Sequence, residues 1–303
     1  DLYYTSGGSA VFTSIAMSGT GSSWSGLIPG AEVSRNGIIY YIAATDPLEY
    51  NALSDTFGVA VTFPAGNLTT SSADGSGYSG GLPIDKWRLL AVPAVLTTAT
   101  VAGVISDELG AQSNATWRIF RYDQNTSTYK ENPNDFTPGE AYWIYQRVED
   151  NLVLTAPGGQ TGNMSGTSLT IVPGWSLISS PYPFPIDAAL NQTLFYGPIT
   201  YGVSAESWTD VQTELIPWSG YALYNRTSND QTVTLNPIAS TSGTLARTVQ
   251  KEGWLMNLAV TAGVYADQFN QLGRIIGAEE GLDHYDNPEL LPPGTYLSLA
   301  FAL

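Results

Sequence analysis

Apolar and polar positions alternate along most of this chain in short runs, and turns containing glycine or asparagine separate the runs. Alternation with period two over four to eight residues is the pattern of a half-buried β-strand, whereas an amphipathic helix repeats every three to four residues. Asn36-Gly37, directly before the apolar run 38–41, is a typical two-residue hairpin turn. The first 66 residues therefore predict a module of short strands, at 2–6, 12–18, 24–29, 38–46 and 57–64.

Helical periodicity is confined to three short segments. Residues 186–194, with Asp187 near the start, predict two helical turns, and residues 46–54 and 106–110 predict one turn each. Residues 67–85 are rich in Gly and Ser and have no periodicity, which is typical of a linker or a long loop. The predicted fold class is therefore all-β, with sandwich-like modules on either side of this linker.

An internal repeat follows the linker. The segment 87–93 (WRLLAVP) matches the segment 175–181 (WSLISSP). Each of these expected strands is followed by a second tryptophan, Trp117 in the first unit and Trp208 in the second. Self-similarity at this spacing indicates two units of related structure.

Each repeat unit also ends alike, in an aromatic strand that follows a proline turn. These strands are 138–145 (PGEAYWIY) and 217–224 (PWSGYALY), and a weaker copy of the first motif begins at Trp254. We expect a domain at 1–66, the linker at 67–85 and a repeat region at 86–303, with units at about 86–156, 168–236 and 246–303.

The chain resembles a class of large secreted bacterial surface proteins. The patterns LYYxxGG at 2–8 and IYYIxAxD at 39–46 resemble the second half of their immunoglobulin-like module. Residues 86–236 resemble their short β-repeats, GWxLIxxP followed by PGxxYW, and residues 254–299 resemble their terminal piece. The resemblance implies tandem β-sandwich modules, of which the first is immunoglobulin-like and lacks its initial strands. It also implies a structural or adhesive role.

A sandwich without its first strands leaves backbone groups and apolar side chains uncovered, which favours pairing with another strand. Residues 295–303 alternate like a strand, so we expect this segment of a neighbouring copy to be the donor. Head-to-tail contacts of this kind build filaments. The sequence predicts a structural subunit of an extracellular filament or cell-surface assembly, a homopolymer whose assembly residues are Leu2, Tyr3 and Tyr4 in the first module and Tyr296, Leu297, Leu299 and Phe301 in the donor.

The charge balance narrows the setting. The chain has 27 acidic and 11 basic residues, a net charge of −16, although only 13% of its residues are charged. It has no Cys, which excludes disulfides, thiolate metal sites and a cysteine nucleophile. Nucleic-acid binding needs clustered Lys and Arg, so no nucleic-acid partner is expected, and no apolar run is long enough to span a membrane. Few lysines and many hydroxyl residues favour an extracellular or cell-surface location.

One region near the C-terminus carries the candidate metal ligands, which are Asp267, Asn270, Asp283, Asp286 and Glu289. Carboxylate and amide oxygens are the ligands that Ca²⁺ prefers, although the spacing is not that of an EF-hand and the same residues also cap turns. The sequence therefore predicts no cofactor, and calcium is the one alternative that these residues leave open. His284, the only histidine, is expected to be a solvated loop residue and not a catalytic base.

Two further functions stay open at this stage. The chain has 8 Trp and 18 Tyr, which can stack on sugars, and Trp218 beside Pro217 is expected to be exposed. The alternative function is therefore a secreted carbohydrate-binding or adhesive protein with a polysaccharide partner. The third is a secreted hydrolase, which needs paired carboxylates in a deep cleft. Small β-modules leave little scaffold for such a cleft, so the chain is not expected to be an enzyme.

Overall fold

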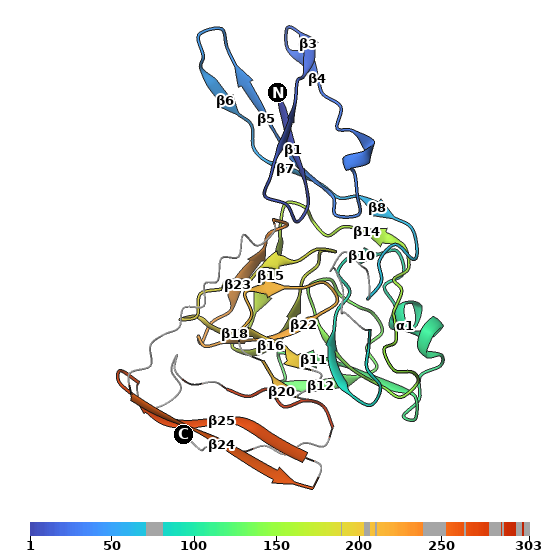
Figure 1. The fold of residues 1–303 in the computed structure, drawn as a ribbon, viewed down its shortest axis with the longest axis vertical. Helices are drawn as coiled ribbons and strands as arrows, with labels where there is room; N and C mark the ends of the chain where they lie inside the picture. The colour runs from blue at the N-terminus through green and yellow to red at the C-terminus, as the bar shows by residue number, and fades with distance from the viewer. Residues whose placement is uncertain are drawn as a thin grey trace.

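The computed structural model describes residues 1–70, 81–188, 190–202, 207–209, 211–238, 253–263, 265–278, 286, 288–294 and 299. The described residues form an all-β fold of the sandwich type with one α-helix, which confirms the predicted class. Figure 1 shows three parts along the long axis of the molecule: an N-terminal sheet, a body and a C-terminal hairpin.

The N-terminal sheet contains, in spatial order, β2 (Thr13–Ile15), β1 (Leu2–Ser6), β5 (Ile38–Thr45) and β6 (Asn51–Leu53), with β7 (Phe57–Val59) also paired to β5. Alternation along β1 buries Leu2 and Tyr4, while Tyr3 lies on the other face and stacks on Tyr41 with ring centroids 4.9 Å apart. The predicted helical turn at 46–54 is wrong. Asp46 Oδ1 accepts the N–H groups of Leu48 and Tyr50, which turns the chain back into β6.

Beside this sheet lie the hairpin β3 (Ser18–Thr20) and β4 (Ser23–Ser25) and the 3₁₀ turn Gly30–Glu32. The next strand, β8 (Thr62–Phe63), leaves the N-terminal sheet and pairs with β14 (Gly159–Gln160), which in turn pairs with β10 (Val95–Leu96). Both described ends of the predicted linker contribute to the body, because Leu68 and Leu82 are buried in its core and residues 71–80 lie outside the described part.

The body contains two sheets with the same strand order. The first unit has the order β12 (Thr128–Glu131), β11 (Trp117–Asp123), β13 (Tyr142–Gln146), β9 (Trp87–Leu90), and the second has β18 (Phe195–Ile199), β22 (Gly220–Asn225), β16 (Gly174–Ser179). The strands β11-β13-β9 correspond to β18-β22-β16. Trp87 lies opposite Tyr145 just as Trp175 lies opposite Tyr224. The repeat in the sequence is therefore a repeat in structure.

The two repeat units also share individual hydrogen bonds. The buried hydroxyl of Tyr142 accepts the N–H of Thr137 at 2.8 Å, and the hydroxyl of Tyr221 accepts the N–H of Ile216 at the same distance. In both units the backbone donor is five residues before the tyrosine. Each tyrosine thus fixes the proline turn that leads into its own strand.

The second tryptophan of each unit does not follow the repeat. Trp117 is buried on β11, where its indole N–H donates to Gly110 O at 3.1 Å. Trp208 lies on β20 (Ser207–Trp208), which pairs with β19 (Tyr201–Gly202) outside the three-stranded sheet. The weaker motif at Trp254 begins the hairpin β24 (Gly253–Ala262) and β25 (Tyr265–Ile275), in which the described strands pair only with each other.

Three apolar layers hold the body together. The two sheets face each other across an aromatic layer that includes Trp143 and Trp175. The far side of the first sheet is covered by α1 (Val101–Leu109) and by Leu154, and the far side of the second by β15 (Thr167–Ile171) and β23 (Gln231–Leu235). The N-terminal sheet joins this outer layer through Ile39, which packs in the cluster of Met164.

The remaining helix predictions differ from the structure. The predicted turn at 106–110 is the end of the longer helix α1, whose N-terminus is capped by Thr100 Oγ1 accepting the N–H of Gly103 at 3.1 Å. The predicted helix at 186–194 is wrong, because β17 (Ile186–Asp187) pairs with β21 (Glu214–Leu215). Ile186 and Leu215 are both fully buried, so tertiary packing outweighs the local helical pattern.

Candidate assembly surfaces

Exposed large apolar side chains are concentrated at the two ends of the described molecule. The N-terminal sheet and the hairpin β24–β25 carry most of them, whereas the body between buries its apolar residues in three clusters. Contiguous exposed apolar surface on a folded protein marks a site of interaction. The two ends lie at opposite extremes of the long axis in Figure 1.

The head surface is the sheet edge formed by β6 and β7, with Phe57 and Val59 on one face of the sheet and Leu53 on the other. Leu53, Phe57 and Val59 are 71%, 44% and 47% exposed, and Phe57 stacks on Tyr40 with ring centroids 5.3 Å apart. Both strands pair with β5 on one side, and among the described strands none pairs with their other side. An apolar edge strand with free backbone groups is a template for a strand of another chain.

The tail surface is formed by Trp254, Met256 and Leu272 on the hairpin. Met256 lies opposite Leu272, and Trp254 lies two residues before Met256, so the three side chains share one face. They are 55%, 46% and 40% exposed. Farther along this face Leu258 is half-buried, so the apolar stripe is covered at one end of the hairpin and uncovered at the other.

The predicted assembly residues fall into two groups. Leu2, Tyr3 and Tyr4 form β1, an inner strand that pairs with both β2 and β5. Of the predicted donor, Tyr296, Leu297 and Phe301 lie outside the described residues, and Leu299 donates its N–H to Asp267 Oδ2 of the same chain at 2.8 Å. Among the described strands, the free edges of this sheet belong to β2, β6 and β7 instead of β1.

The predicted metal ligands are only partly described. Asp267 is buried on β25, and its carboxylate accepts the Leu299 N–H. Asn270 follows on the same strand, Glu289 is exposed, and Asp283 lies outside the described residues, as does His284. Among the described residues no group of three or more His, Asp or Glu side chains is placed to hold a metal ion. Calcium binding at Asp267, Asn270, Asp283, Asp286 and Glu289 stays a prediction.

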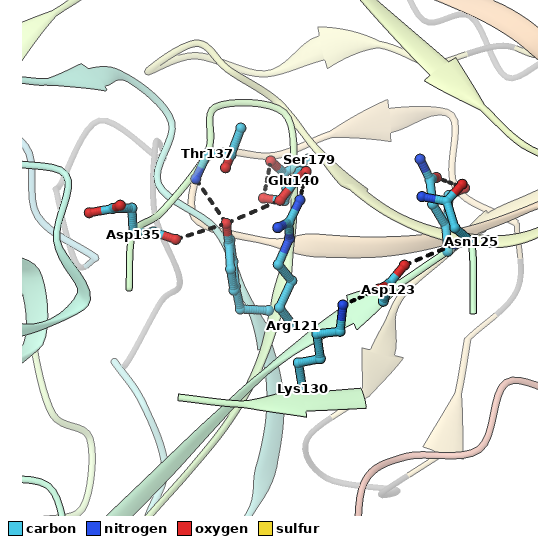
Figure 2. A network of polar contacts seen from close by, with 11 residues as sticks. Arg121, Asp123, Asn125, Lys130, Asp135, Thr137, Glu140 and Ser179 are labelled. Atoms are coloured by element: carbon cyan, nitrogen blue, oxygen red, sulfur yellow. Dashed lines mark hydrogen bonds and ion pairs between the residues drawn. The ribbon is translucent and has the colours of Figure 1, made fainter. Parts of the chain in front are cut away.

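A polar network ties the first repeat unit to the second (Figure 2). Arg121 Nη2 lies 2.7 Å from Glu140 Oε1, and this hydrogen bond raises the pKa of the arginine. The backbone oxygen of Glu140 accepts the hydroxyl of Ser179 from the second unit at 2.9 Å. Nearby, Lys130 pairs with Asp123. The network holds the turn before β13 against the neighbouring sheet.

The predicted exposure of Trp218 is wrong. Trp218 has no exposed surface and lies in the core of the first unit, with Leu90 and Trp117. Its backbone occupies the position of Gly139 in the repeat and has a positive φ of 64°, against 86° for Gly139. Sugar stacking on Trp218 is therefore excluded in the folded chain, and the exposed tryptophans among the described residues are Trp24 and Trp254.

Among the described residues, Glu108 is the titratable group whose pKa departs most from its ordinary value. Its Oε1 accepts the N–H of Thr155 at 2.8 Å, while Oε2 is buried without a hydrogen-bond partner. Burial raises the pKa of Glu108 to about 7, and the adjacent Asp107 acts in the same direction. Its place in the last turn of α1, at the negative end of the helix dipole, also favours the neutral acid.

Stability is expected to fall as pH rises from 5 to 8. Glu108 ionises near 4.5 when unfolded but near 7 when folded, so its stabilisation is complete below pH 4.5 and lost as pH passes 7. Because the residue is partly exposed, we expect a loss of about 1–2 kcal/mol. Urea unfolding at pH 5, 6, 7 and 8 measures it. Glu108→Gln should remove this dependence, and an unchanged dependence in that variant contradicts the assignment.

The sequence contained one signal for the tail surface. Trp254, Met256, Leu258 and Val260 alternate with period two, which predicts one apolar strand face. The same signal is present in buried strands such as β16, so it does not tell which faces stay uncovered.

Comparison with models of protein families, with curated proteins and with solved structures found no match to this chain. No helix in the described part of the chain is long and apolar enough to cross a membrane.

Proposed function

We propose that this protein is a structural subunit of an extracellular filament or cell-surface assembly, and that it associates head to tail with copies of itself. The observation that carries the proposal is the pair of uncovered apolar β-surfaces at opposite ends of one molecule. The head surface offers free strand edges at Leu53 and Val59, and the tail surface offers a two-stranded ladder with an apolar face. Two different, complementary surfaces on one chain make an open-ended contact.

The chemistry of both surfaces favours pairing between them. A lone two-stranded hairpin is marginally stable in water, so β24–β25 gains from joining a larger sheet. The edge strands β6 and β7 gain hydrogen-bond partners for their outer backbone groups. The six apolar side chains of the two surfaces are uncharged, and Arg274, opposite Trp254, adds one positive charge to the tail face of a chain whose net charge is −16.

Blocking either surface with lysine is expected to abolish assembly. Leu53→Lys with Val59→Lys places charges on the head edge, and Met256→Lys places one on the tail stripe. All three side chains are exposed, so the fold should tolerate the changes. Sedimentation velocity should show polymers for the unaltered chain and monomers for each blocked variant. Val148→Lys, at an exposed apolar position of the body, is the matched control and should assemble normally.

Mixing the two blocked variants provides the decisive measurement. A head-blocked chain keeps its tail and a tail-blocked chain keeps its head, so an equimolar mixture should form a 1:1 dimer that grows no further. A contact between two identical surfaces predicts a different result, since one blocked variant would still dimerise alone. Polymers of either variant alone, or a mixture that stays monomeric, would disprove head-to-tail assembly through these surfaces.

A further inference from the structure

The segment 288–294 (PELLPPG) lies on the body in the manner of a bound peptide. Leu290 is only 5% exposed and belongs to the aromatic layer between the two sheets. Its carbonyl oxygen accepts the indole N–H of Trp208 at 2.9 Å, and the next carbonyl, of Leu291, accepts the hydroxyl of Tyr129 at 2.6 Å. Among the described strands none pairs with this segment. Side chains of the body, and not a β-ladder, hold it in place.

The side chains that hold the segment are themselves fixed. Trp143, which is fully buried, donates its indole N–H to the Tyr129 oxygen at 3.2 Å, so the Tyr129 hydroxyl proton is directed to Leu291 O. Trp208 packs edge-on against Trp143 with ring centroids 5.7 Å apart. At the far end, Gly294 lies against the ring of Trp87, so close that an added Cβ would lie 3.3 Å from Trp87 Cζ2. We call Trp87, Tyr129 and Trp208 the aromatic site.

This arrangement has the chemistry of recognition of extended proline-containing peptides. Such peptides present carbonyl oxygens and proline rings at low entropic cost, and aromatic side chains with N–H or O–H groups bind them. Here Leu290 and Pro293 are both buried, while Glu289, directly before Leu290, is exposed. The site therefore selects an apolar side chain, two carbonyl oxygens and a proline.

We propose that the aromatic site also binds the segment 288–294 of a second copy of the chain, which would link neighbouring subunits laterally. Every contact made within one chain is available between two chains, so exchange of the segment costs little. Twelve residues, 276–287, join the end of β25 to the segment, and a chain of this length spans at most about 40 Å. This contact is independent of the proposed head-to-tail contact, because it uses none of the head or tail residues.

A peptide with the sequence of residues 288–294, labelled with a fluorophore, tests the site. The receptor is the full chain with Leu290→Asp, which places a carboxylate at a buried apolar position and so empties its own site. We expect saturable binding, and none of a control peptide that carries the same Leu→Asp change. Adding Tyr129→Phe to the receptor keeps the ring but removes the one hydrogen bond that this side chain donates to the peptide, and should weaken binding about fivefold to tenfold. The receptor's own thermal unfolding transition verifies that it is folded, and Leu290→Ala replaces Leu290→Asp if it is not.

Sedimentation of two chains tests the partner. Both carry Leu53→Lys, Val59→Lys and Met256→Lys, so the outcome does not depend on head-to-tail contacts. The first chain also carries Leu290→Asp, which empties its aromatic site, and the second keeps Leu290 but carries Trp208→Ala and Tyr129→Phe, which release the segment from its own site. An equimolar mixture should form a 1:1 complex that excess free peptide dissociates, and each chain alone should be monomeric. No peptide binding to a folded receptor beyond that of the control peptide overturns the site. Peptide binding without the 1:1 complex overturns the second copy as its partner.

Discussion

Replacing Trp218 by alanine is expected to lower the free energy of unfolding by about 3–5 kcal/mol. The side chain is fully buried among Leu90, Trp117 and their neighbours, so truncation leaves a large cavity in the core of the first unit. Its indole nitrogen has no hydrogen-bond partner, so the loss comes from packing and not from a broken hydrogen bond. Denaturation in guanidinium chloride, followed by circular dichroism, measures the change.

Trp218→Gly is expected to have a free energy of unfolding about 1 kcal/mol higher than that of Trp218→Ala. Trp218 has a φ of 64°, a left-handed conformation that costs alanine energy and glycine none. Ordinarily alanine is the more stabilising of the two, so the order of the two variants reports the backbone and not the cavity. Trp254→Ala, at a 55% exposed position, is the control and should change stability by less than about 0.5 kcal/mol. An alanine variant as stable as the glycine variant would show that the backbone at 218 is unstrained.

The burial of Trp218 also shows why the sequence alone predicts the exposure of this side chain wrongly. A tryptophan next to a proline in a turn is normally at the surface, and the local pattern contains nothing else. The repeat contains the missing information. Strand β9 of the first unit ends against the turn of the second unit, where Ala91 donates its N–H to Trp218 O at 3.0 Å. In the reciprocal contact, Ser179 of the second unit donates its N–H to Gly139 O of the first at 2.9 Å. The turn is buried because two units pack together, which no local pattern encodes.

The strands themselves were largely predictable, because each depends on its own alternation. The predictions at 2–6 and 38–46 correspond to β1 and β5, and the repeat motifs at Trp87 and Trp175 to β9 and β16. Pairing between distant elements was not predictable. Ile186 becomes a strand because Leu215 lies opposite it, 29 residues later in the sequence. Long-range partners override local helical preference.

The assembly surfaces illustrate the same point. Trp175-x-Leu177 and Trp254-x-Met256 have the same period and the same residue classes, yet Trp175 is 8% exposed and Trp254 is 55% exposed. The first pair faces a second sheet across the aromatic layer, and the second pair is uncovered in the described structure. Whether an apolar strand face becomes core or contact surface is decided by what packs against it.

The substitution Gly220→Ala, which adds one methyl group, is expected to lower the free energy of unfolding by about 3 kcal/mol. This value is at the upper end of the range for overpacking. Gly220 and Ala141 are equivalent positions of the two repeat units, and they meet where the units pack together. A Cβ on Gly220 would lie 2.6 Å from the Ala141 Cβ and 2.8 Å from the Leu89 Cβ. None of these atoms can rotate away, because each is a Cβ attached directly to the backbone. The two sheets would have to separate, which also loosens the aromatic layer around Trp143.

Exchanging the two residues tests this explanation. The double variant with Gly220→Ala and Ala141→Gly returns one methyl group to the contact, on the opposite side of the joint. If the clash between equivalent positions is the cause, the double variant should recover at least about 1 kcal/mol of the loss. The clash with Leu89 remains, so recovery is expected to be incomplete. Urea unfolding of the unaltered chain, both single variants and the double variant gives the coupling energy, and strictly additive losses would place the strain outside the joint between the two repeats.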